Sequence, residues 1–546
     1  MSVVNIYGTT ISQSSISIFY KHVQPLFPFR LILIFSSSIP RNMASDVASV
    51  SAWFQGRNVF VTGGSGFMGK VLIYKLLLSC HDLGNIYVLV RKKKDVDPQS
   101  RLKLMLQENP FKMIEEKYPE KLEKIILIPG DTTCKDLALS TADKQRLMDE
   151  VSVVFHMAAN VKFDLTLKEA VTINILGTKN VTNLVKQLPH LKSFIHVSTS
   201  YCHCNEPVLE EKHYPCNLDP EEIIEMVNTR PDDFLELMTP TLLQGLPNTY
   251  SFSKALAEDL VQKCGVPTGI ARPSIVVASW KEPKPGWVDN LNGPTGLMVA
   301  AGKGVVRSVL CNYDYKMNII PCDVAINAII VLAWKVGREN IKKPLFMNVT
   351  NGMDSSISWG WAVDTGKKYA VMYPFTGVLW YPGGSLTTLK WFHWLRVILF
   401  HYIPALFIDT LVLLTGNKPF LIKVHNRINL GIKLIQYYTT KQWNFPNDRM
   451  KELHSEMNSS DKEEFFMDTT EINWDEYMLI YILGTRQYCL KNDLSTLPRA
   501  RKVLRYLYFA DWFVKIGLTI FFAPNLEYRE INSIKITTNT NTSQWV

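Results

Sequence analysis

This sequence of 546 residues lacks the features that mark several protein classes. Its nine cysteines follow no framework spacing and are odd in number, so we expect reduced thiols and a reducing compartment instead of a disulfide scaffold. No nucleic-acid motif is present, and a formal net charge of +9 is modest for this length. A composition with 47% hydrophobic and 20% charged residues is typical of globular chains, and the length predicts at least two domains.

The basic residues that are present gather locally. RKKK at Arg91 to Lys94 and RARK at Arg499 to Lys502 suit phosphates or an anionic membrane face better than a nucleic-acid groove. Residues 1–42 are rich in Ser, Ile and Phe and contain a short apolar run at 26–35, which Arg30 interrupts. No small-residue cleavage site follows cleanly, and Met43 begins a more ordinary polar stretch. We therefore expect a dispensable extension or an upstream start in preference to a targeting signal.

A glycine-rich turn lies between a strand pattern and a helix pattern. RNVFVT at 57–62 predicts a buried strand, and VLIYKLLLSC at 71–80 predicts a helix. Glycine permits the tight turn and lets backbone N–H groups at a helix N-terminus approach a pyrophosphate. The strand-turn-helix context predicts a dinucleotide site. The residues that we expect to bind the cofactor here are Thr62, Gly63, Gly64, Ser65, Gly66, Phe67, Met68 and Gly69.

The end of the second predicted strand, NIYVLV at 85–90, indicates which cofactor is bound. An enzyme that uses NAD usually carries Asp or Glu there, whereas this chain has Arg91, followed by Lys92 to Lys94. A guanidinium can bind a phosphate with two hydrogen bonds, so this residue favours the 2′-phosphate of NADP. The alternative is a solvated basic turn.

Further strand patterns follow at intervals typical of alternating strands and helices: 125–131, 151–160, 193–201 and 269–279. Their two-sided apolar character predicts a parallel sheet covered by helices, and thus an α/β, Rossmann-type doubly wound fold. Ligands of such sheets bind at the carboxyl ends of the strands. Cofactor residues expected at these ends are Asp131, Ala158 and Ala159, and the pair Ser198 and Thr199 ends the fifth strand.

The stretch NTYSFSKALAE at 248–258 places a tyrosine one helical turn before a lysine. Helix formers from Ser253 to Cys264, closed by Gly265, predict that Tyr250 and Lys254 share a helix face. By itself this pattern is also that of a surface helix with a chance pair. After a glycine turn and a strand that ends in hydroxyl groups, it predicts carbonyl reduction. Tyr250 would donate the proton, Lys254 would lower the phenol pKa and hold the ribose, and Thr199, or alternatively Ser198, would orient the carbonyl oxygen.

These features resemble the extended short-chain dehydrogenase/reductases, and most closely the fatty acyl-CoA reductases of the animal and especially insect type. The resemblance runs from about Trp53 to Ala523 and rests on the blocks VTGGSGFMGKVL, HMAANVKFD, NILGTKNV, HVSTSYCHC, TYSFSKALAE, RPSIVVASWKEPKPGWVDNLNGPTG and PCDVAINAII. It implies NADPH-dependent reduction of a long-chain or very-long-chain fatty acyl-CoA to a primary alcohol. It also adds Pro273 to the cofactor residues and implies that the block at 272–296 contributes to the acyl-CoA site. The alternatives are a steroid or sugar-nucleotide reductase and an inactive lipid-binding homologue.

The resemblance also implies a domain plan. We expect an NADP-binding domain at 53–350, a helical C-terminal domain at 360–495, an apolar segment at 500–523 and a polar tail at 525–546. The apolar segments His401 to Leu414 and Tyr506 to Ala523 contain Asp409 and Asp511, so they predict either monotopic membrane contacts or packed core helices. The expected partners are acyl-CoA and membrane lipid but not nucleic acid. The expected location is the cytosolic side of the endoplasmic reticulum, the peroxisome or a lipid droplet.

One cluster could suggest a metal site. Cys202, His203, Cys204, His213 and Cys216 lie close in sequence, but their spacing matches no zinc finger or ribbon. We therefore expect ordinary thiols and loop histidines, and no metal.

Overall fold

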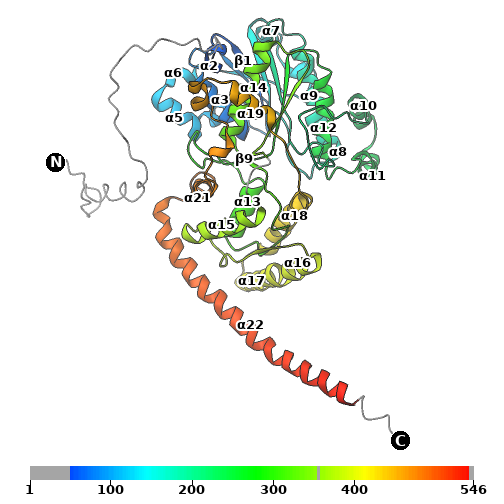
Figure 1. The fold of residues 1–546 in the computed structure, drawn as a ribbon, viewed down its shortest axis with the longest axis vertical. Helices are drawn as coiled ribbons and strands as arrows, with labels where there is room; N and C mark the ends of the chain where they lie inside the picture. Colours follow the sequence, from blue (N-terminus) through cyan, green and yellow to red (C-terminus); the bar gives the residue numbers. More distant parts are fainter. Residues whose placement is uncertain (1–48, 353–356, 540–546) are drawn as a thin grey trace, which may run out of the picture. The chain divides into compact units, whose positions relative to one another are not determined.

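The computed structural model describes residues 49–352 and 357–539, without the side chains of 518, 519 and 521–539. The predicted extension at 1–42 lies outside these residues. Seven parallel strands form the central sheet in the order β10-β6-β5-β4-β1-β2-β3 (Figure 1). Their bounds are β1 Asn58–Thr62, β2 Ile86–Val90, β3 Ile125–Pro129, β4 Val151–His156, β5 Ser193–Val197, β6 Thr268–Pro273 and β10 Leu345–Val349. The chain thus winds outward in one direction from β1 and then in the other from β4, which is the doubly wound topology expected from the sequence.

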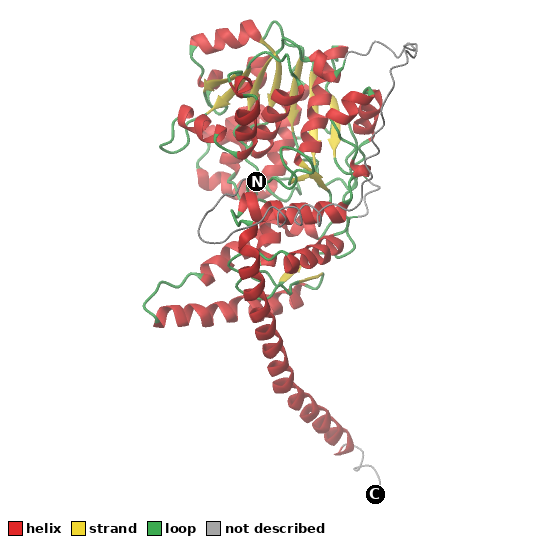
Figure 2. Cartoon of the chain, turned by 90° about the vertical axis from the view of Figure 1, so that its left-hand side faces the viewer, coloured by secondary structure: helices red, strands yellow, loops and turns green. Residues whose placement is uncertain are grey.

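Helices cover both faces of the sheet, as Figure 2 shows for the yellow strands between red helices. Successive strand residues point to opposite faces, so Val59 and Val61 pack in one apolar core and Phe60 in another. The helices are α2 Val50–Trp53, α3 Phe67–Ser79, α4 Pro98–Leu106, α5 Asn109–Lys117, α6 Pro119–Leu122, α7 Thr141–Glu150, α8 Leu167–Ala170, α9 Gly177–Val185, α10 Pro220–Thr229, α11 Asp232–Leu242, α12 Thr249–Gln262, α13 Pro294–Gly302 and α14 Cys322–Glu339.

The C-terminal part is mostly helical, as predicted. Its helices are α15 Trp359–Met372, α16 Lys390–Val397, α17 Ile403–Leu414, α18 Leu421–Thr439, α19 Asp448–Glu456, α20 Ser459–Glu464, α21 Trp474–Gly484 and α22 Leu497–Asn539. Two short parallel pairs accompany them, β7 Ile275–Val277 with β9 Ile319–Pro321 and β8 Ser308–Leu310 with β11 Ser385–Thr387. One apolar core contains residues of both parts, among them Val299, Ile320, Trp359 and Tyr477. The predicted domain boundaries therefore stay predictions.

Two details of the sheet differ from the sequence prediction. The run at 269–279 was expected to be one strand, but β6 ends at Pro273 and β7 belongs to a separate pair. Proline has no N–H for the ladder, so the chain leaves the sheet at this residue. The seventh strand, β10, was not predicted, although Asn340 and Pro344 separate its short apolar run from the preceding helix.

Candidate active site

The glycine turn after β1 has the close backbone packing that a phosphate cradle needs. Gly63 has a φ of +76°, and a Cβ on it would lie 2.7 Å from the backbone nitrogen of Ala158. A Cβ on Gly69 would lie 2.3 Å from the carbonyl oxygen of Gly63. Larger residues would therefore push apart the turn, α3 and the segment after β4. The N-terminus of α3 begins in this turn, so its free N–H groups and dipole favour an anion there.

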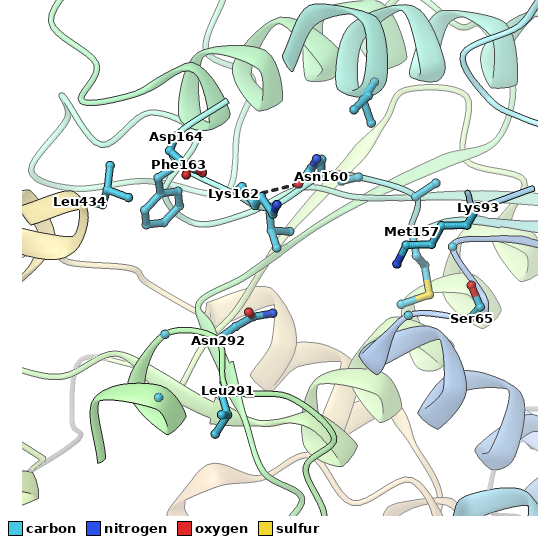
Figure 3. A pocket seen from close by; sticks show the side chains of 18 of the residues that line it. Ser65, Lys93, Met157, Asn160, Lys162, Phe163, Asp164, Leu291, Asn292 and Leu434 are labelled. Carbon is cyan, nitrogen blue, oxygen red and sulfur yellow. Dashed lines mark hydrogen bonds between the residues drawn. The ribbon is translucent and has the colours of Figure 1, made fainter. Parts of the chain in front are cut away.

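A cavity of about 1020 Å³ opens beside this turn. Seven predicted cofactor residues line it: Gly63, Ser65, Gly66, Arg91, Asp131, Ala158 and Ala159. Across from the segment Met157 to Asp164 lie Leu291 and Asn292 (Figure 3), which belong to the block that we linked to acyl-CoA. Among the described residues, Thr62, Gly64, Phe67, Met68, Gly69 and Pro273 do not line the cavity. Thr62 is buried, and its hydroxyl oxygen lies 2.7 Å from Nδ1 of His156.

Basic side chains lie at the polar end of this cavity. Arg91 lies at the end of β2, as predicted, and its Nη1 is 3.8 Å from the carboxylate of Asp131. Arg101, on α4, donates from Nη2 to Oγ of Ser65 at 3.1 Å and from Nη1 to the carbonyl oxygen of Arg91. Burial and the nearby charge of Arg91 lower the pKa of Arg101. Two guanidinium groups that repel each other favour a bound phosphate, so the fit to NADP is good.

Arg101 was not among the predicted cofactor residues. It lies ten residues beyond Arg91, past a turn, and its helix carries no motif. A basic residue on the helix after the second strand was the only available signal.

The predicted catalytic residues come together behind the cavity. Helix α12 begins at Thr249, where the side-chain oxygen of Asn248 caps it by accepting from the N–H of Ser251 at 2.9 Å. Tyr250 and Lys254 therefore lie on the same helix. Thr199 follows β5 and forms a hydrogen bond with Tyr250, which offsets part of the rise that burial causes in the phenol pKa. Ser198, the alternative, is buried beside it.

The expected effect of Lys254 on Tyr250 is wrong in this structure. Nζ of Lys254 donates to the carbonyl oxygen of Val197 at 2.7 Å, and the pKa of Tyr250 lies above its usual value because the phenol is buried. Burial also lowers the pKa of Lys254 to about 8, although the charge of Glu258 opposes this. Tyr250 thus keeps its proton near neutral pH, which suits a proton donor.

Tyr250, Lys254 and Thr199 are not among the described residues that line the large cavity. Tyr250 contacts one of the lining side chains. The ring of Phe163, which lines the cavity, lies 5.7 Å from the ring of Tyr250. Tyr250 is itself partly exposed, so the phenol lies next to the cavity and in contact with its lining.

A buried polar network supports the same helix. Asn174 lies in the π-helix Val171–Leu176, and its Nδ2 donates to Oγ of Ser253 at 2.9 Å and to the carbonyl oxygen of Asn160 at 3.1 Å. Its Oδ1 accepts from the N–H of Asn160 at 2.9 Å. This residue ties α12 to the cavity segment after β4. Sequence reasoning noted it only as the first residue of the block NILGTKNV.

The possible metal ligands are divided among several partners. Cys202 and His203 lie close to Glu258, and all three are buried. Despite burial, the guanidinium of Arg272 holds the pKa of Glu258 well below its usual range, with contacts of 2.9 and 2.6 Å. His213 pairs with Asp259 at 2.6 Å. The carboxylate is thus already neutralised by arginine, and the absence of a metal stays a prediction.

A second, smaller chamber of about 120 Å³ adjoins the large cavity. Leu297 and Val306 line both. The other walls are mostly apolar and include Met298, Val309, Met317 and Leu386. The two spaces together offer a polar end beside the glycine turn and an apolar end beneath α13 and α15.

The C-terminal part completes the site. Ile428, Gly431 and Ile432 of α18 line the large cavity. At the end of the same helix, the hydroxyl group of Tyr438 lies 2.9 Å from Nδ2 of Asn248 and 3.0 Å from Oγ of Ser251. Its ring is 5.2 Å from that of Phe163. Helix α18 thus contacts the N-terminus of α12 and the side chain of Phe163, which packs against Tyr250.

Among the described residues, one helix, Lys390–Leu414, is long and apolar enough to cross a membrane. It joins α16, the π-helix Ile398–Tyr402 and α17 without a break. By length and composition alone it is weak evidence of membrane association.

Comparisons with known proteins agree with this architecture. A family model described as male sterility protein matches residues 61–329, and a second model of the same description matches 400–492. The reductase domain of a non-ribosomal peptide synthetase from Mycobacterium tuberculosis has a similar fold, with a TM-score of 0.53, 18% identity, and coverage of 81% of this chain and 96% of that one.

Curated relatives are much closer in sequence. Fatty acyl-CoA reductase 1 of Rattus norvegicus is 37% identical over 465 residues, which cover 84% of this chain and 90% of the relative. Fatty acyl-CoA reductase wat of Drosophila melanogaster is 32% identical over 459 residues, covering 84% and 89%. The chain therefore belongs to the fatty acyl-CoA reductase family.

Proposed function

We propose that this protein reduces a long-chain or very-long-chain fatty acyl-CoA to a primary alcohol with NADPH and releases CoA. The observation that carries the proposal is the pair of neighbouring cavities: the larger one offers basic and glycine-lined surface for a phosphorylated dinucleotide, and the smaller one offers apolar surface for part of an acyl chain. The ring of Tyr250 contacts Phe163, which lines the larger of the two cavities.

Bound NADPH supplies the hydride. Tyr250 gives its proton to the thioester oxygen as negative charge develops there, and Thr199 orders the phenol through their hydrogen bond. The resulting hemithioacetal breaks its C–S bond, so CoA leaves as the thiol and an aldehyde remains. A second hydride and a second proton convert the aldehyde to the alcohol. Lys254, with a pKa of about 8, exchanges protons readily near neutral pH and can restore the proton of the site.

A tyrosine variant tests the reaction. Tyr250→Phe keeps the ring and removes the proton, so NADPH should still bind while turnover of acyl-CoA falls by roughly 10²–10⁴-fold. Tyr214→Phe is a matched control, because the Tyr214 hydroxyl accepts from the N–H of Glu210 and lies outside the cavity lining. The measurement is NADPH oxidation together with extraction of the alcohol. Near-normal activity in Tyr250→Phe would remove this residue from the mechanism.

We further propose that the enzyme works at a membrane, with its active site on the cytosolic side of the endoplasmic reticulum, the peroxisome or a lipid droplet. Two observations support this location. All nine cysteines are free thiols, and large apolar side chains are exposed along α16, α17 and α22. Localisation of the full chain together with markers of the three compartments would choose among them.

A further inference from the structure

The helix Lys390–Leu414 exposes an unusual number of large apolar side chains. Between 36% and 78% of the surface of each is exposed. They are Trp391, Phe392, Trp394, Leu395, Ile398, Leu399, Phe400, Ile403, Leu406, Phe407, Ile408, Leu411, Leu413 and Leu414. An apolar surface of this extent marks an interaction site. Its length would also allow it to cross a bilayer, so the question is how it meets the lipid.

Polar contacts fasten the other side of this helix to the body of the protein. Nδ1 of His393 lies 2.9 Å from Oγ of Ser308 on β8, and Arg396 donates to Oγ of Ser385 on β11. Two turns beyond His393, Nε2 of His401 accepts from the backbone N–H of Arg307 at 2.9 Å. The helix therefore lies along the small sheet β8 and β11. To cross a membrane, it would have to break these contacts or take strands with open edges into the hydrocarbon, which is strongly unfavourable.

The one acidic residue of the helix explains why the chain turns back. The carboxylate of Asp409 accepts hydrogen bonds from the N–H groups of Phe420, Leu421 and Ile422 at 2.8–3.0 Å. These are the first donors of α18, so Asp409 caps that helix across the turn. Further back, the hydroxyl group of Tyr402 bonds Asn426 and Asn429 of α18 at 2.9 and 3.0 Å. Helices α17 and α18 thus form a hairpin, and the chain returns to the side from which it came.

The basic residues around the hairpin indicate that it binds an anionic lipid surface. Residues 390–441 contain the basic residues Lys390, Arg396, Lys418, Lys423, Arg427, Lys433 and Lys441, and Asp409 is the only acid in this range. With seven basic residues and one ionised acid, this range carries a formal net charge of +6 when its histidines are neutral. Each basic residue close to an anionic membrane contributes about 1 kcal/mol of attraction. Apolar side chains beside uncompensated basic ones are typical of a helix that lies in the membrane interface.

From these contacts we propose that the hairpin of α16, α17 and α18 docks in the plane of one leaflet of an anionic phospholipid membrane and does not cross it. Both ends of the helix Lys390–Leu414 then stay on the side of the active site. Helix α18 also lines the large cavity, so docking brings the apolar end of the cavity next to the lipid. An acyl chain or fatty alcohol could pass between membrane and site without entering water. The inference concerns attachment alone and does not depend on the proposed reaction.

Flotation of the full chain with sealed vesicles tests the docking. The vesicles are made of phosphatidylcholine, with or without phosphatidylserine. The wild type should float with anionic vesicles and lose most of this binding in high salt. A Phe407→Ser, Leu411→Ser double variant should float at least tenfold less. Leu237→Ser, on the well exposed Leu237 of α11, should float as the wild type does. Thermal unfolding of each variant checks that the fold is kept.

A labelling experiment tests the orientation. Lys390→Cys and Lys418→Cys are each introduced into a Cys134→Ser parent, because Cys134 is the exposed thiol among the cysteines. After the proteins bind preformed vesicles, a membrane-impermeant maleimide should label both introduced residues. Protection of position 418 with labelling at 390 would show a crossing helix and overturn the proposal. Equal flotation with neutral vesicles would overturn the proposal that the membrane must be anionic. A change of oligomeric state in the double variant, without loss of flotation, would instead assign the surface to a second copy of the chain.

Discussion

At the scale of single residues, the basic groups at the end of β2 should decide cofactor choice. Replacing Arg91 by Ser removes one of the two guanidinium groups placed for a 2′-phosphate. A hydrogen bond between charged groups contributes about 1.5–3 kcal/mol, so NADPH should bind roughly 10–100-fold more weakly. NADH, which lacks this phosphate, should bind as before. Lys103→Ser is the control, because Lys103 is exposed on the same helix as Arg101 and does not line the cavity. Titration by protein fluorescence measures both cofactors, and equal loss for both would indicate a structural role.

Lys254 is buried, and its charge should make the folded chain less stable. The pKa of Lys254 is about 8 in the folded chain, against 10.5 when exposed. While Lys254 is charged in the folded state, its burial therefore lowers the free energy of unfolding. Below pH 8 this costs on the order of 3 kcal/mol at 1.36 kcal/mol per pKa unit. Between pH 8 and 10.5 the unfolded chain binds the extra proton, so the stability of the wild type rises with pH, and above 10.5 the cost is gone. Lys254→Met should therefore be inactive yet unfold at a higher temperature than the wild type at pH 7, with a gap that closes towards pH 10.5.

Lys254→Met also loses the hydrogen bond to the carbonyl oxygen of Val197. This loss reduces the expected gain in the free energy of unfolding by about 1 kcal/mol. Melting curves at pH 7 and above pH 10 measure the difference. A variant that is less stable by the same amount at both pH values would show that the lysine charge carries no penalty.

The same residues show how far sequence reasoning reaches. Spacing placed Tyr250 and Lys254 on one helix face, and this is confirmed. It could not show that Nζ of Lys254 points to the carbonyl oxygen of Val197, because the partner lies 57 residues away on another element. The predicted downward shift of the Tyr250 pKa was therefore wrong. The shift depends on burial, which a local sequence pattern does not reveal.

At the scale of elements, a substitution in α15 should change which acyl chain lengths the enzyme accepts. A Cβ on Gly366 would meet nothing within 4 Å, although this residue lines the small apolar chamber. Gly366→Leu should fill the chamber without a clash and exclude the end of the longest acyl chains. Each methylene that loses its buried place costs about 0.8 kcal/mol, or roughly fourfold in kcat/KM. Activity with shorter acyl-CoA should be kept.

Gly517→Leu is the matched control, since a Cβ at this helical glycine also meets open space but lies away from both cavities. Met298→Ala, which widens the chamber, should shift activity towards longer chains. The measurement is kcat/KM across a series of acyl-CoA lengths. A uniform loss at all lengths in Gly366→Leu would place the acyl chain elsewhere.

Elements with a strong local signal were predictable, and those fixed by distant contacts were not. The first six strands of the sheet and the helix after the glycine turn follow from apolar runs and turn residues, and the structure confirms them. The π-helix that contains Asn174 and the strand β10 were missed. The first depends on bonds to Asn160 and Ser253, and the second on pairing with β6 from about 75 residues away.

At the scale of the whole molecule, the catalytic site is shared between the two parts of the chain. Tyr438 contacts Asn248 across 190 residues, and α18 supplies cavity walls to a site whose chemistry lies on α12. The sequence predicted which residues carry the chemistry, but it could not place the C-terminal helices beside them. If the acyl chain binds in the apolar cavity, as proposed, the C-terminal helices bear on which product is released.

The product should therefore be alcohol, with two NADPH oxidised for each CoA thiol released. After the first reduction, CoA leaves, but the aldehyde keeps its acyl chain among Leu297, Val306 and Ile432. At about 0.8 kcal/mol per buried methylene, a long chain is held far more tightly than its polar head group alone would be. The group that protonates a thioester oxygen is equally suited to an aldehyde oxygen, so Tyr250 serves both steps. NADPH absorbance, a thiol reagent and gas chromatography of the extract measure the three quantities together. Short acyl-CoA should release some aldehyde because fewer methylenes are buried, whereas a ratio near one with free aldehyde from long acyl-CoA would show that the intermediate is not retained.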